Sequence, residues 1–265
     1  MPKLALITGA SAGLGVDFAR ELASFGHNLI LTARRLDRLE ALGQELEKKH
    51  GIVVHCISSD LSSEEGCQKL LDVLRDKGLS PDILINNAGY GACGAFDQLP
   101  SENQMGMISL NVLALCWLTR QLLPDMLKRK QGYILNVASV AAFQPGPGMA
   151  TYFATKAFVL SFSEALHEEV LEHGVHVSCL CPGTTRTEFF EVAGADHVPS
   201  APGTMESLPV VRAGLNGMWG NQAVVVPGWH NFLTVQLNRF LPRFVVRKAA
   251  KMIVLKRFLT QSNLS

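Results

Sequence analysis

The stretch Thr8-Gly9-Ala10-Ser11-Ala12-Gly13-Leu14-Gly15 follows a short apolar run, Leu4-Ala5-Leu6-Ile7, and opens a helical pattern that continues to about residue 25. Glycines at such a junction let the backbone turn sharply and approach a pyrophosphate, whose charge is met by free amides and the positive end of the helix dipole. An ordinary glycine-bearing turn is the alternative for this stretch alone. The stretch predicts a dinucleotide-binding turn whose candidate contacts are Gly9, Ser11, Gly13, Leu14 and Gly15.

Short apolar runs alternate with longer helical patterns along the chain, which is typical of βαβ units and a parallel sheet. The seven expected strands lie near residues 3–8, 28–33, 52–57, 82–86, 132–138, 175–180 and 222–226. The expected helices lie near residues 13–25, 36–49, 63–77, 102–129 and 151–173. Several strands are apolar throughout, as expected when helices cover both faces of the sheet. The sequence therefore predicts an α/β fold with a doubly wound, Rossmann-type parallel sheet of about seven strands.

With 265 residues and 48% hydrophobic composition, the chain can bury one large core, and we expect a single domain. Residues 1–228 are expected to form its dinucleotide-binding catalytic part. Residues 184–209 depart from the alternation and carry several Gly and Pro residues, which predicts a long loop that selects the substrate. Residues 229–265 are expected to form a basic amphipathic extension of the same domain.

Composition excludes several classes of function. The 24 Lys and Arg residues nearly balance the 23 Asp and Glu residues, so the charge gives no reason to expect nucleic acid as a partner. The cysteines are scattered, and the spacing of Cys179 and Cys181 matches neither a redox pair nor a zinc half-site, so we expect no metal and no disulfide. No secretory signal is seen, which predicts a reducing, cytoplasmic location. The most apolar segment, near 107–123, contains polar residues and is expected to be a buried helix.

Arg34 and Arg35 follow the second expected strand, where a dinucleotide-binding fold contacts the adenosine ribose. An acid at this position accepts a hydrogen bond from the free 2′-hydroxyl of NAD(H), whereas an Arg accommodates the 2′-phosphate of NADP(H). No acid stands at the end of this strand, and an Arg can bind a phosphate in bidentate fashion. The sequence therefore favours NADP(H) over NAD(H), although two solvated arginines before a helix would give the same pattern.

Tyr152 and Lys156 are four residues apart on a helical pattern, which places both side chains on one helix face. A carbonyl that accepts a hydride becomes an alkoxide, so its reduction needs a proton donor and a group that polarises the oxygen. Tyr152 and Ser139 fit these two roles. A phenol titrates near pH 10, and the Lys156 ammonium is expected to lower that pKa. The same spacing is also common on ordinary amphipathic helices, so the pair needs support from its context.

Four motifs supply that context and together resemble the classical short-chain dehydrogenase/reductase family. They are T-G-x-x-x-G-x-G at residues 8–15, N-N-A-G at residues 86–89, S-x12-Y-x-x-x-K at residues 139–156 and P-G-x-x-x-T at residues 182–187. The resemblance extends from residue 4 to about residue 190 and again through the last expected strand. It implies a Rossmann-type fold, a nicotinamide cofactor and carbonyl–alcohol chemistry, with Arg34 pointing to the NADP(H)-preferring type.

The resemblance also implies a catalytic tetrad of Asn111, Ser139, Tyr152 and Lys156, in which Asn111 holds a water that passes protons from Lys156 to bulk solvent. Without the family, Asn111 reads as a buried core amide.

For the cofactor, the resemblance makes Arg34 the phosphate ligand, with Ser11 or Arg35 assisting. Beside Tyr152 and Lys156 themselves, the other implied cofactor contacts are Asp60, Leu61, Asn87, Ala88, Gly89, Pro182, Gly183, Thr185 and Thr187. Without the family, Asp60 reads equally well as a residue at a helix N-cap.

The predicted activity is NADPH-dependent interconversion of a carbonyl and a secondary or primary alcohol. Residues 141–150, residues 184–209 and the C-terminal tail would select the substrate, and the apolar side chains of the first two segments predict a small apolar carbonyl or alcohol. These side chains are Phe143, Pro145, Pro147, Met149, Phe189, Phe190 and Val192. The alternative is a protein of the same fold that binds NADP(H) as a sensor or scaffold without turnover, which would be expected to lose Tyr152 or Lys156.

The C-terminal tail has an unusual charge pattern. No Asp or Glu follows Glu206, whereas eight Lys and Arg residues do. Seven of these cations lie between Trp229 and Leu259, interleaved with aromatic and aliphatic residues, as in a basic amphipathic helix that lies on an anionic membrane. We hypothesise weak peripheral membrane contact, with packing over the substrate pocket or a neighbouring subunit as the alternative. The resemblance also implies a homodimer or homotetramer formed through the helices that contain Asn111 and Tyr152.

Overall fold

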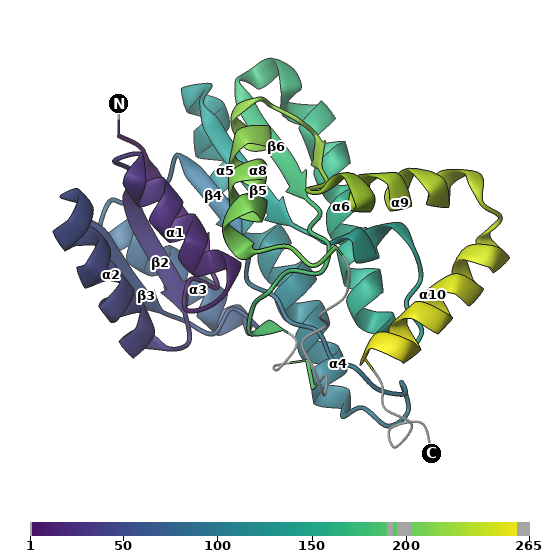
Figure 1. The fold of residues 1–265 in the computed structure, drawn as a ribbon. Helices are drawn as coiled ribbons and strands as arrows, with labels where there is room; N and C mark the ends of the chain where they lie inside the picture. The colour runs from purple at the N-terminus through teal and green to yellow at the C-terminus, as the bar shows by residue number, and fades with distance from the viewer. Residues whose placement is uncertain (1, 190–192, 195–202, 259–265) are drawn as a thin grey trace.

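The computed structural model describes residues 2–189, 193–194 and 203–258, and it shows one seven-stranded sheet (Figure 1). All strand pairs are parallel, and the order across the sheet is β3-β2-β1-β4-β5-β6-β7. The strands are β1 Leu4–Thr8, β2 Asn28–Ala33, β3 Val54–Ser58, β4 Ile83–Asn86, β5 Gly132–Val137, β6 Val175–Leu180 and β7 Val224–Val225. The predicted fold class is confirmed, and every predicted strand is present.

Helices cover both faces of the sheet because its strands are apolar on both sides. Alternate residues of β1 show this: Ala5 and Ile7 belong to one buried cluster, and Leu6 belongs to the other. The first cluster packs against α1 Leu14–Ser24, α2 Leu36–His50 and α8 Ser207–Trp219. The second packs against α3 Glu64–Asp76, α5 Leu115–Arg129 and α6 Ala150–Val170. The sheet thus has a complete helical layer on each side.

The helix α8 was not among the predicted helices, and the predicted loop 184–209 overlaps its start. Its buried face includes Val210, Val211, Leu215 and Met218, which is a recognisable helical stripe. Glycine disfavours helix formation, and Gly214 and Gly217 obscure this stripe in the sequence. Gly214 is required for packing, because a Cβ atom there would lie 2.8 Å from Leu180 Cδ2.

A continuous helical stretch runs from Ser101 to Arg129 through α4 Ser101–Ile108, the π-helical turn η1 Ser109–Ala114 and α5. By length and composition it is the one helix, among the residues that the structure describes, that could cross a membrane. In the structure it packs against β5 and α6. It therefore contributes to the core of the domain, as expected from its polar interruptions.

The C-terminal tail forms two helices rather than the single one expected. These are α9 Trp229–Phe240 and α10 Arg243–Phe258, which project beside α6 and turn back (Figure 1). Pro242 lies between them, and proline lacks the amide that a continuing helix would need. Residues 259–265 of the predicted extension lie outside the described residues.

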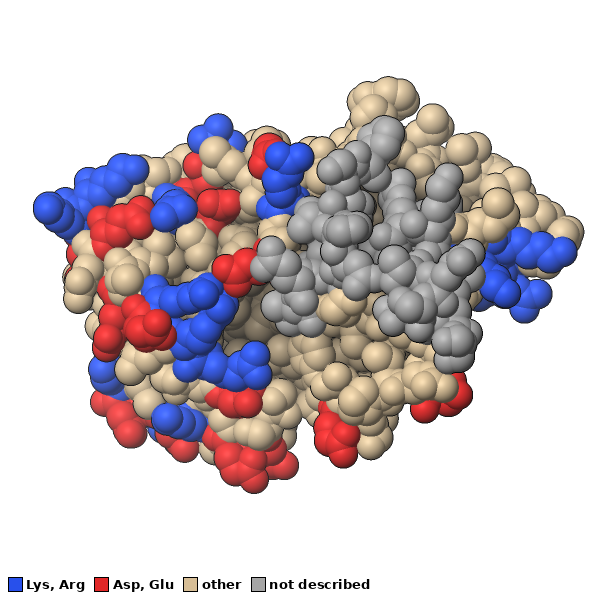
Figure 2. Space-filling model, turned by 60° about the horizontal axis from the view of Figure 1, so that its bottom comes forward, with Lys and Arg blue, Asp and Glu red and all other residues tan. Residues whose placement is uncertain are grey.

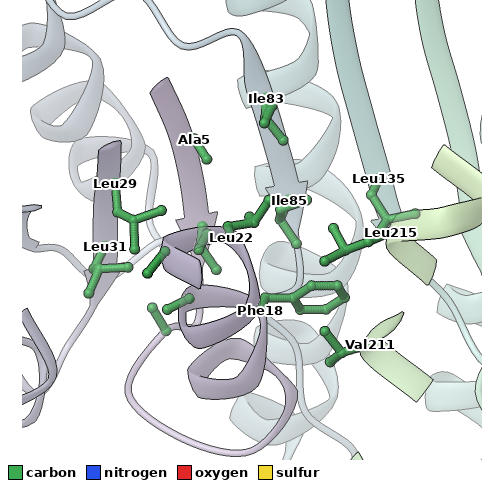
Figure 3. Packing of buried hydrophobic residues seen from close by; sticks show 14 of the residues in the cluster. Ala5, Phe18, Leu22, Leu29, Leu31, Ile83, Ile85, Leu135, Val211 and Leu215 are labelled. Atoms are coloured by element: carbon green, nitrogen blue, oxygen red, sulfur yellow. The ribbon is translucent and has the colours of Figure 1, made fainter. Parts of the chain in front are cut away.

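The ring of Phe18 on α1 is fully buried and points toward Val211 and Leu215 of α8 (Figure 3). We predict that Phe18→Ala lowers the free energy of unfolding by about 3–5 kcal/mol, because it removes apolar contacts and leaves a cavity. Urea denaturation measures the change. Phe25→Ala is the matched control, since Phe25 is 57% exposed and its loss should cost less than about 0.5 kcal/mol. Equal losses in the two variants would contradict this account of the core.

Candidate active site

The candidate site lies at the carboxyl ends of β1 and β4, where the strand order reverses. Ligands of doubly wound folds bind at this reversal. The side chains of Thr8 and Asn87 hold the two strand ends together. Thr8 Oγ1 accepts from the amides of Asn87, at 3.0 Å, and Ala88, at 2.9 Å, while Asn87 Nδ2 donates to Thr8 O at 2.9 Å. Asn87 and Ala88 therefore stand beside the glycine turn.

The glycine turn has the shape that a diphosphate requires. Gly9 and Gly13 have φ values of 66° and 55°, which side chains disfavour. A Cβ on Gly9 would lie 2.9 Å from Ala88 Cα, and a Cβ on Gly15 would collide with Gly9 O. The helix α1 begins at Leu14 with no side chain capping its N-terminus, so its first amides are available to an anion. The turn predicted from sequence thus fits a dinucleotide.

An open hollow of about 420 Å³ lies at the expected adenosine end and is lined by Arg34, Ser58, Ser59, Asp60, Glu65, Gly66 and Lys69. Arg34 is exposed. Asp60 accepts hydrogen bonds from Ser62 N at 3.0 Å and Ser62 Oγ at 2.7 Å. Although burial opposes it, these bonds and the Arg34 charge lower the pKa of the Asp60 carboxyl. The hollow thus contains a cation, Arg34, that can bind a phosphate, and a carboxylate, Asp60, that can accept a hydrogen bond from a ligand.

The structure shows what surrounds two predicted cofactor contacts at this end, Asp60 and Leu61. The helix that follows Asp60 is capped by Ser63, which accepts from Gly66 N at 3.0 Å, so Asp60 is not its N-cap. The side chain of Leu61 is 4% exposed and belongs to the apolar core, which leaves only its backbone for a ligand.

Arg35 and Ser11, the two residues predicted to assist Arg34, lie together, since Arg35 Nη2 donates to Ser11 Oγ at 3.2 Å. Glu188 also holds this edge, because it pairs with Arg35 at 3.5 Å and with Arg38 at 3.0 Å. Arg35 is therefore partly neutralised, whereas Arg34 forms no ion pair within the described part of the chain. Arg34 is the better placed of the two for a phosphate.

Tyr152 lies on the first turn of α6, and the side chain of Ser139 lies near enough to its phenol to lower the phenol's pKa. Ser139 follows β5 and begins the short helix η2 Val140–Phe143. Its Oγ accepts from Ala141 N at 3.1 Å and donates to Pro182 O at 3.3 Å. These bonds hold the Ser139 hydroxyl beside the phenol.

Burial raises the pKa of Tyr152 to about 12, and the neighbouring Ser139 side chain opposes this rise. The expectation that Lys156 would lower the pKa was therefore wrong for the protein alone. The physical reason is desolvation, because Tyr152 is only 9% exposed and the charged phenolate loses its hydration. Tyr152 is thus held as a proton-carrying acid.

Lys156 is buried one helical turn below, with its Nζ 5.8 Å from the centre of the Tyr152 ring. Nζ donates to Val137 O at 2.8 Å. Burial lowers the pKa of Lys156 to about 8. The ammonium is therefore close to releasing a proton near neutral pH, as a group in a proton relay must be.

Asn111 lies in the π-helical turn η1 and is buried beside Lys156. A Cβ on Gly89 would lie 2.9 Å from Asn111 Oδ1 and 3.5 Å from Lys156 Nζ, so the three residues share one small space. Asn111 Oδ1 accepts from Tyr90 N at 3.1 Å, and Nδ2 donates to Tyr90 O at 2.9 Å and to Thr155 Oγ1 at 3.1 Å. Both Nδ2 hydrogens of Asn111 are therefore used within the protein, and these bonds fix the side chain beside Lys156.

The loop after β6 closes the other side of the site. Pro182 O accepts from Ser139 Oγ, and Thr185 Oγ1 donates to Gly183 O at 3.0 Å. Thr187 meets the glycine turn, because a Cβ on Gly13 would lie 3.3 Å from Thr187 Cβ. The loop therefore contacts Ser139 at Pro182 and the glycine turn at Thr187.

An apolar wall stands next to Tyr152. The ring of Phe189 lies 5.2 Å from that of Tyr152, and a Cβ on Gly91 would lie 3.2 Å from Met149 Cε. A small adjoining pocket is lined by Ala92, Gly94, Phe96, Leu99, Gln104, Met107, Gly148, Met149, Ala150 and Thr151. Of the predicted wall, Phe190 and Val192 lie outside the described residues.

Sequence reasoning missed several residues that position the site. Thr8 was inside the quoted glycine motif and Thr155 stands next to Lys156, yet neither was assigned a role. Thr155 Oγ1 donates to Tyr152 O at 2.7 Å and accepts from Asn111, so it joins α6 to η1. Glu188 and Tyr90 act through contacts between distant segments, which spacing alone does not reveal.

The chain matches a known family model and several named proteins. The short chain dehydrogenase model covers residues 3–197. A very-long-chain 3-oxoacyl-CoA reductase of Phaeosphaeria nodorum is 34% identical over 248 residues, which cover 89% of this chain and 71% of that protein.

Solved structures are similar over almost the whole chain. A short-chain dehydrogenase from Sphingobium yanoikuyae in complex with NADPH has a TM-score of 0.82 at 36% identity, covering 91% of this chain and 94% of that one. A short chain dehydrogenase/reductase from Burkholderia phymatum in complex with NAD has a TM-score of 0.80 at 25% identity, and the match covers 98% of this chain and 97% of that one. Relatives with this fold therefore bind either nicotinamide cofactor.

The lowered pKa of Lys156 has a measurable effect on stability. Between pH 8 and 10.5 the unfolded chain keeps a proton on Lys156 that the folded chain has lost, so the free energy of unfolding rises with pH. We predict that wild type gains up to about 3 kcal/mol relative to Lys156→Met across this range. Urea denaturation at several pH values measures the difference. A constant difference would contradict the lowered pKa.

Proposed function

This chain belongs to the short-chain dehydrogenase family, and we propose that it is an NADPH-dependent enzyme that interconverts a carbonyl and a secondary or primary alcohol on an apolar substrate. The observation that carries the proposal is the placement of two buried side chains at the carboxyl edge of the sheet: Lys156 Nζ lies 5.8 Å from the centre of the Tyr152 ring. The Ser139 side chain lies beside the same phenol. A sensor or scaffold would not need this arrangement. The intact acid therefore favours turnover over binding alone.

The residues of the site divide the work of carbonyl reduction. The nicotinamide, when bound, supplies the hydride to the carbonyl carbon. Ser139 and Tyr152 donate hydrogen bonds to the carbonyl oxygen and stabilise the charge that develops on it. Tyr152 then releases its proton to that oxygen, and Lys156, whose pKa is lowered to about 8, replenishes it. Asn111 and Thr155 hold α6 and η1 in register during this transfer.

The preference for NADP(H) rests on Arg34. Its side chain is exposed at the hollow, whereas the neighbouring Arg35 is engaged by Ser11 and Glu188. A guanidinium available at this position suits a 2′-phosphate. The glycine turn, the uncapped start of α1 and the loop at Pro182–Thr187 would hold the rest of the cofactor.

An apolar substrate is supported by the wall beside Tyr152, where Met149 and Phe189 meet Gly91. Such an apolar wall offers few hydrogen-bond partners for the hydroxyl groups of a small sugar. The relative that acts on very-long-chain 3-oxoacyl-CoA supports a long acyl or similarly apolar ketone rather than only a small one.

Oligomerisation and location remain predictions of this proposal. Leu113 on η1 and Phe158 on α6 are 58% and 42% exposed, which supports a dimer or tetramer through these helices. The cysteines are free, including the buried Cys179 and Cys181, which supports the reducing, cytoplasmic location.

The role of Tyr152 is tested by Tyr152→Phe. We predict that NADPH consumption with an apolar ketone falls roughly 10²–10⁴-fold, because the acid is lost, while the Kd for NADPH changes little. Stopped-flow absorbance and fluorescence titration measure the two quantities. Tyr133→Phe is the matched control, since Tyr133 lies on β5 far from the carboxyl edge and packs against Trp219. Full turnover in Tyr152→Phe would refute the proposed acid.

The role of Arg34 is tested by Arg34→Ala. Loss of a charged hydrogen bond to the 2′-phosphate should raise the Kd for NADPH roughly 10–100-fold and leave the Kd for NADH unchanged. Arg38→Ala is the control, because Arg38 lies on the same edge but is paired with Glu188. An equal weakening of both cofactors would show that Arg34 does not read the phosphate.

A further inference from the structure

The helix α9 exposes an apolar stripe along one side. Trp229, Phe232, Leu233, Leu237 and Phe240 are 71%, 53%, 49%, 51% and 84% exposed. These five side chains share one face of the helix, because the last four follow Trp229 by three, four, eight and eleven residues, and such spacings return to the same side of a helix. An exposed apolar stripe of this length on a soluble surface marks a site of contact.

The opposite side of α9 already holds the helix to its own domain. Val235 is 3% exposed, and Asn238 Nδ2 donates to Gln144 Oε1 at 2.9 Å. In the first turn, Asn231 Nδ2 donates to Pro227 O at 2.7 Å. The stripe is therefore not the face that docks on this chain, and packing of the stripe over the chain's own pocket is not what the structure shows.

The charges around the stripe are of one sign. Arg239, Arg243, Arg247, Lys248 and Lys251 are exposed on α9 and α10. No Asp or Glu occurs in the sequence after Glu206. Figure 2 shows Lys and Arg side chains gathered on the side of the molecule that α10 forms. The apolar stripe thus continues into a cationic surface that an anion would complement.

A second copy of this chain fits this surface poorly. A symmetric contact between two tails would bring the same patch from each copy together, so cations would face cations. The exposed Leu113 and Phe158 also offer another face to an oligomer. An anionic bilayer, in contrast, accepts aromatic and aliphatic side chains at the acyl boundary while its headgroups attract Arg and Lys.

We propose that α9 and the start of α10 form a binding surface for anionic lipid bilayers, with the stripe Trp229–Phe240 inserted at the headgroup level and the cations of α10 on the headgroups. The surface adjoins the candidate active site, because a Cβ on Gly183 would collide with the Asn231 side chain. An apolar substrate dissolved in the bilayer would therefore lie close to the site, a consequence that rests on the proposed function.

The test uses the full chain and sedimentation with large vesicles of phosphatidylcholine, with and without phosphatidylglycerol, at low and high salt. We expect binding to the anionic vesicles at low salt and its loss in high salt. Arg239→Gln with Arg243→Gln should weaken binding roughly 30-fold, at about 1 kcal/mol for each cation. Phe232→Ser with Phe240→Ser should abolish it, whereas Phe25→Ser, on the exposed end of α1, should not.

Controls separate this surface from folding and from the reaction. Circular dichroism and NADPH binding report whether each variant is folded, and vesicle binding is measured without substrate, so an inactive enzyme can still bind lipid. Failure to bind anionic vesicles at low salt would overturn the proposal, as would equal binding to both vesicle types. If Phe232→Ser with Phe240→Ser instead converts an oligomer into monomers in sedimentation velocity, the stripe is a subunit interface and the proposal is wrong.

Discussion

The hydrogen bonds between Thr8 and Asn87 hold the ends of β1 and β4 at a fixed separation, and the site is built around that point. The strand order reverses there, so the loops after the two strands diverge and leave space for a ligand. Because the Asn87 side chain reaches the backbone of Thr8 and Gly9, the glycine turn cannot move independently of β4. The same contacts bring Gly89 against Asn111 and Lys156, which links the phosphate end to the reactive end.

A buried chain of polar groups gives the reactive end its orientation. Asn86 Nδ2 donates to Thr119 Oγ1 at 3.0 Å and to Asn136 Oδ1 at 2.9 Å, and Asn136 Nδ2 donates to Ser163 Oγ at 2.9 Å. These bonds tie β4, β5, α5 and α6 together inside an otherwise apolar core. A buried polar group left without its partner costs about 1–3 kcal/mol, so alternative rotations of α6 are disfavoured. These buried hydrogen bonds therefore fix which face of α6 points toward the active site.

Much of this arrangement follows from the sequence because parallel strands impose it. Each strand ends at the same edge, so the motifs at residues 8–15, 86–89, 139 and 182–187 had to converge. The helix α8 was missed because glycines needed for close packing also weaken its pattern. The pKa of Tyr152 was given the wrong direction because desolvation depends on burial, which spacing does not report. The partners of Asn111 and the role of Glu188 depend on contacts between segments far apart in the chain, such as Arg38 with Glu188.

The π-helical turn at Ser109–Ala114 acts as a phase shift within one long helix. A single additional residue in a turn rotates everything beyond it by about 100° relative to a regular helix. Gln104 and Met107 can therefore face the substrate side, while Leu118 and Met126 face the sheet. The segment has, in effect, two amphipathic registers joined at Asn111. An insertion or deletion of one residue at this junction would therefore turn Gln104 and Met107 away from the pocket that they line.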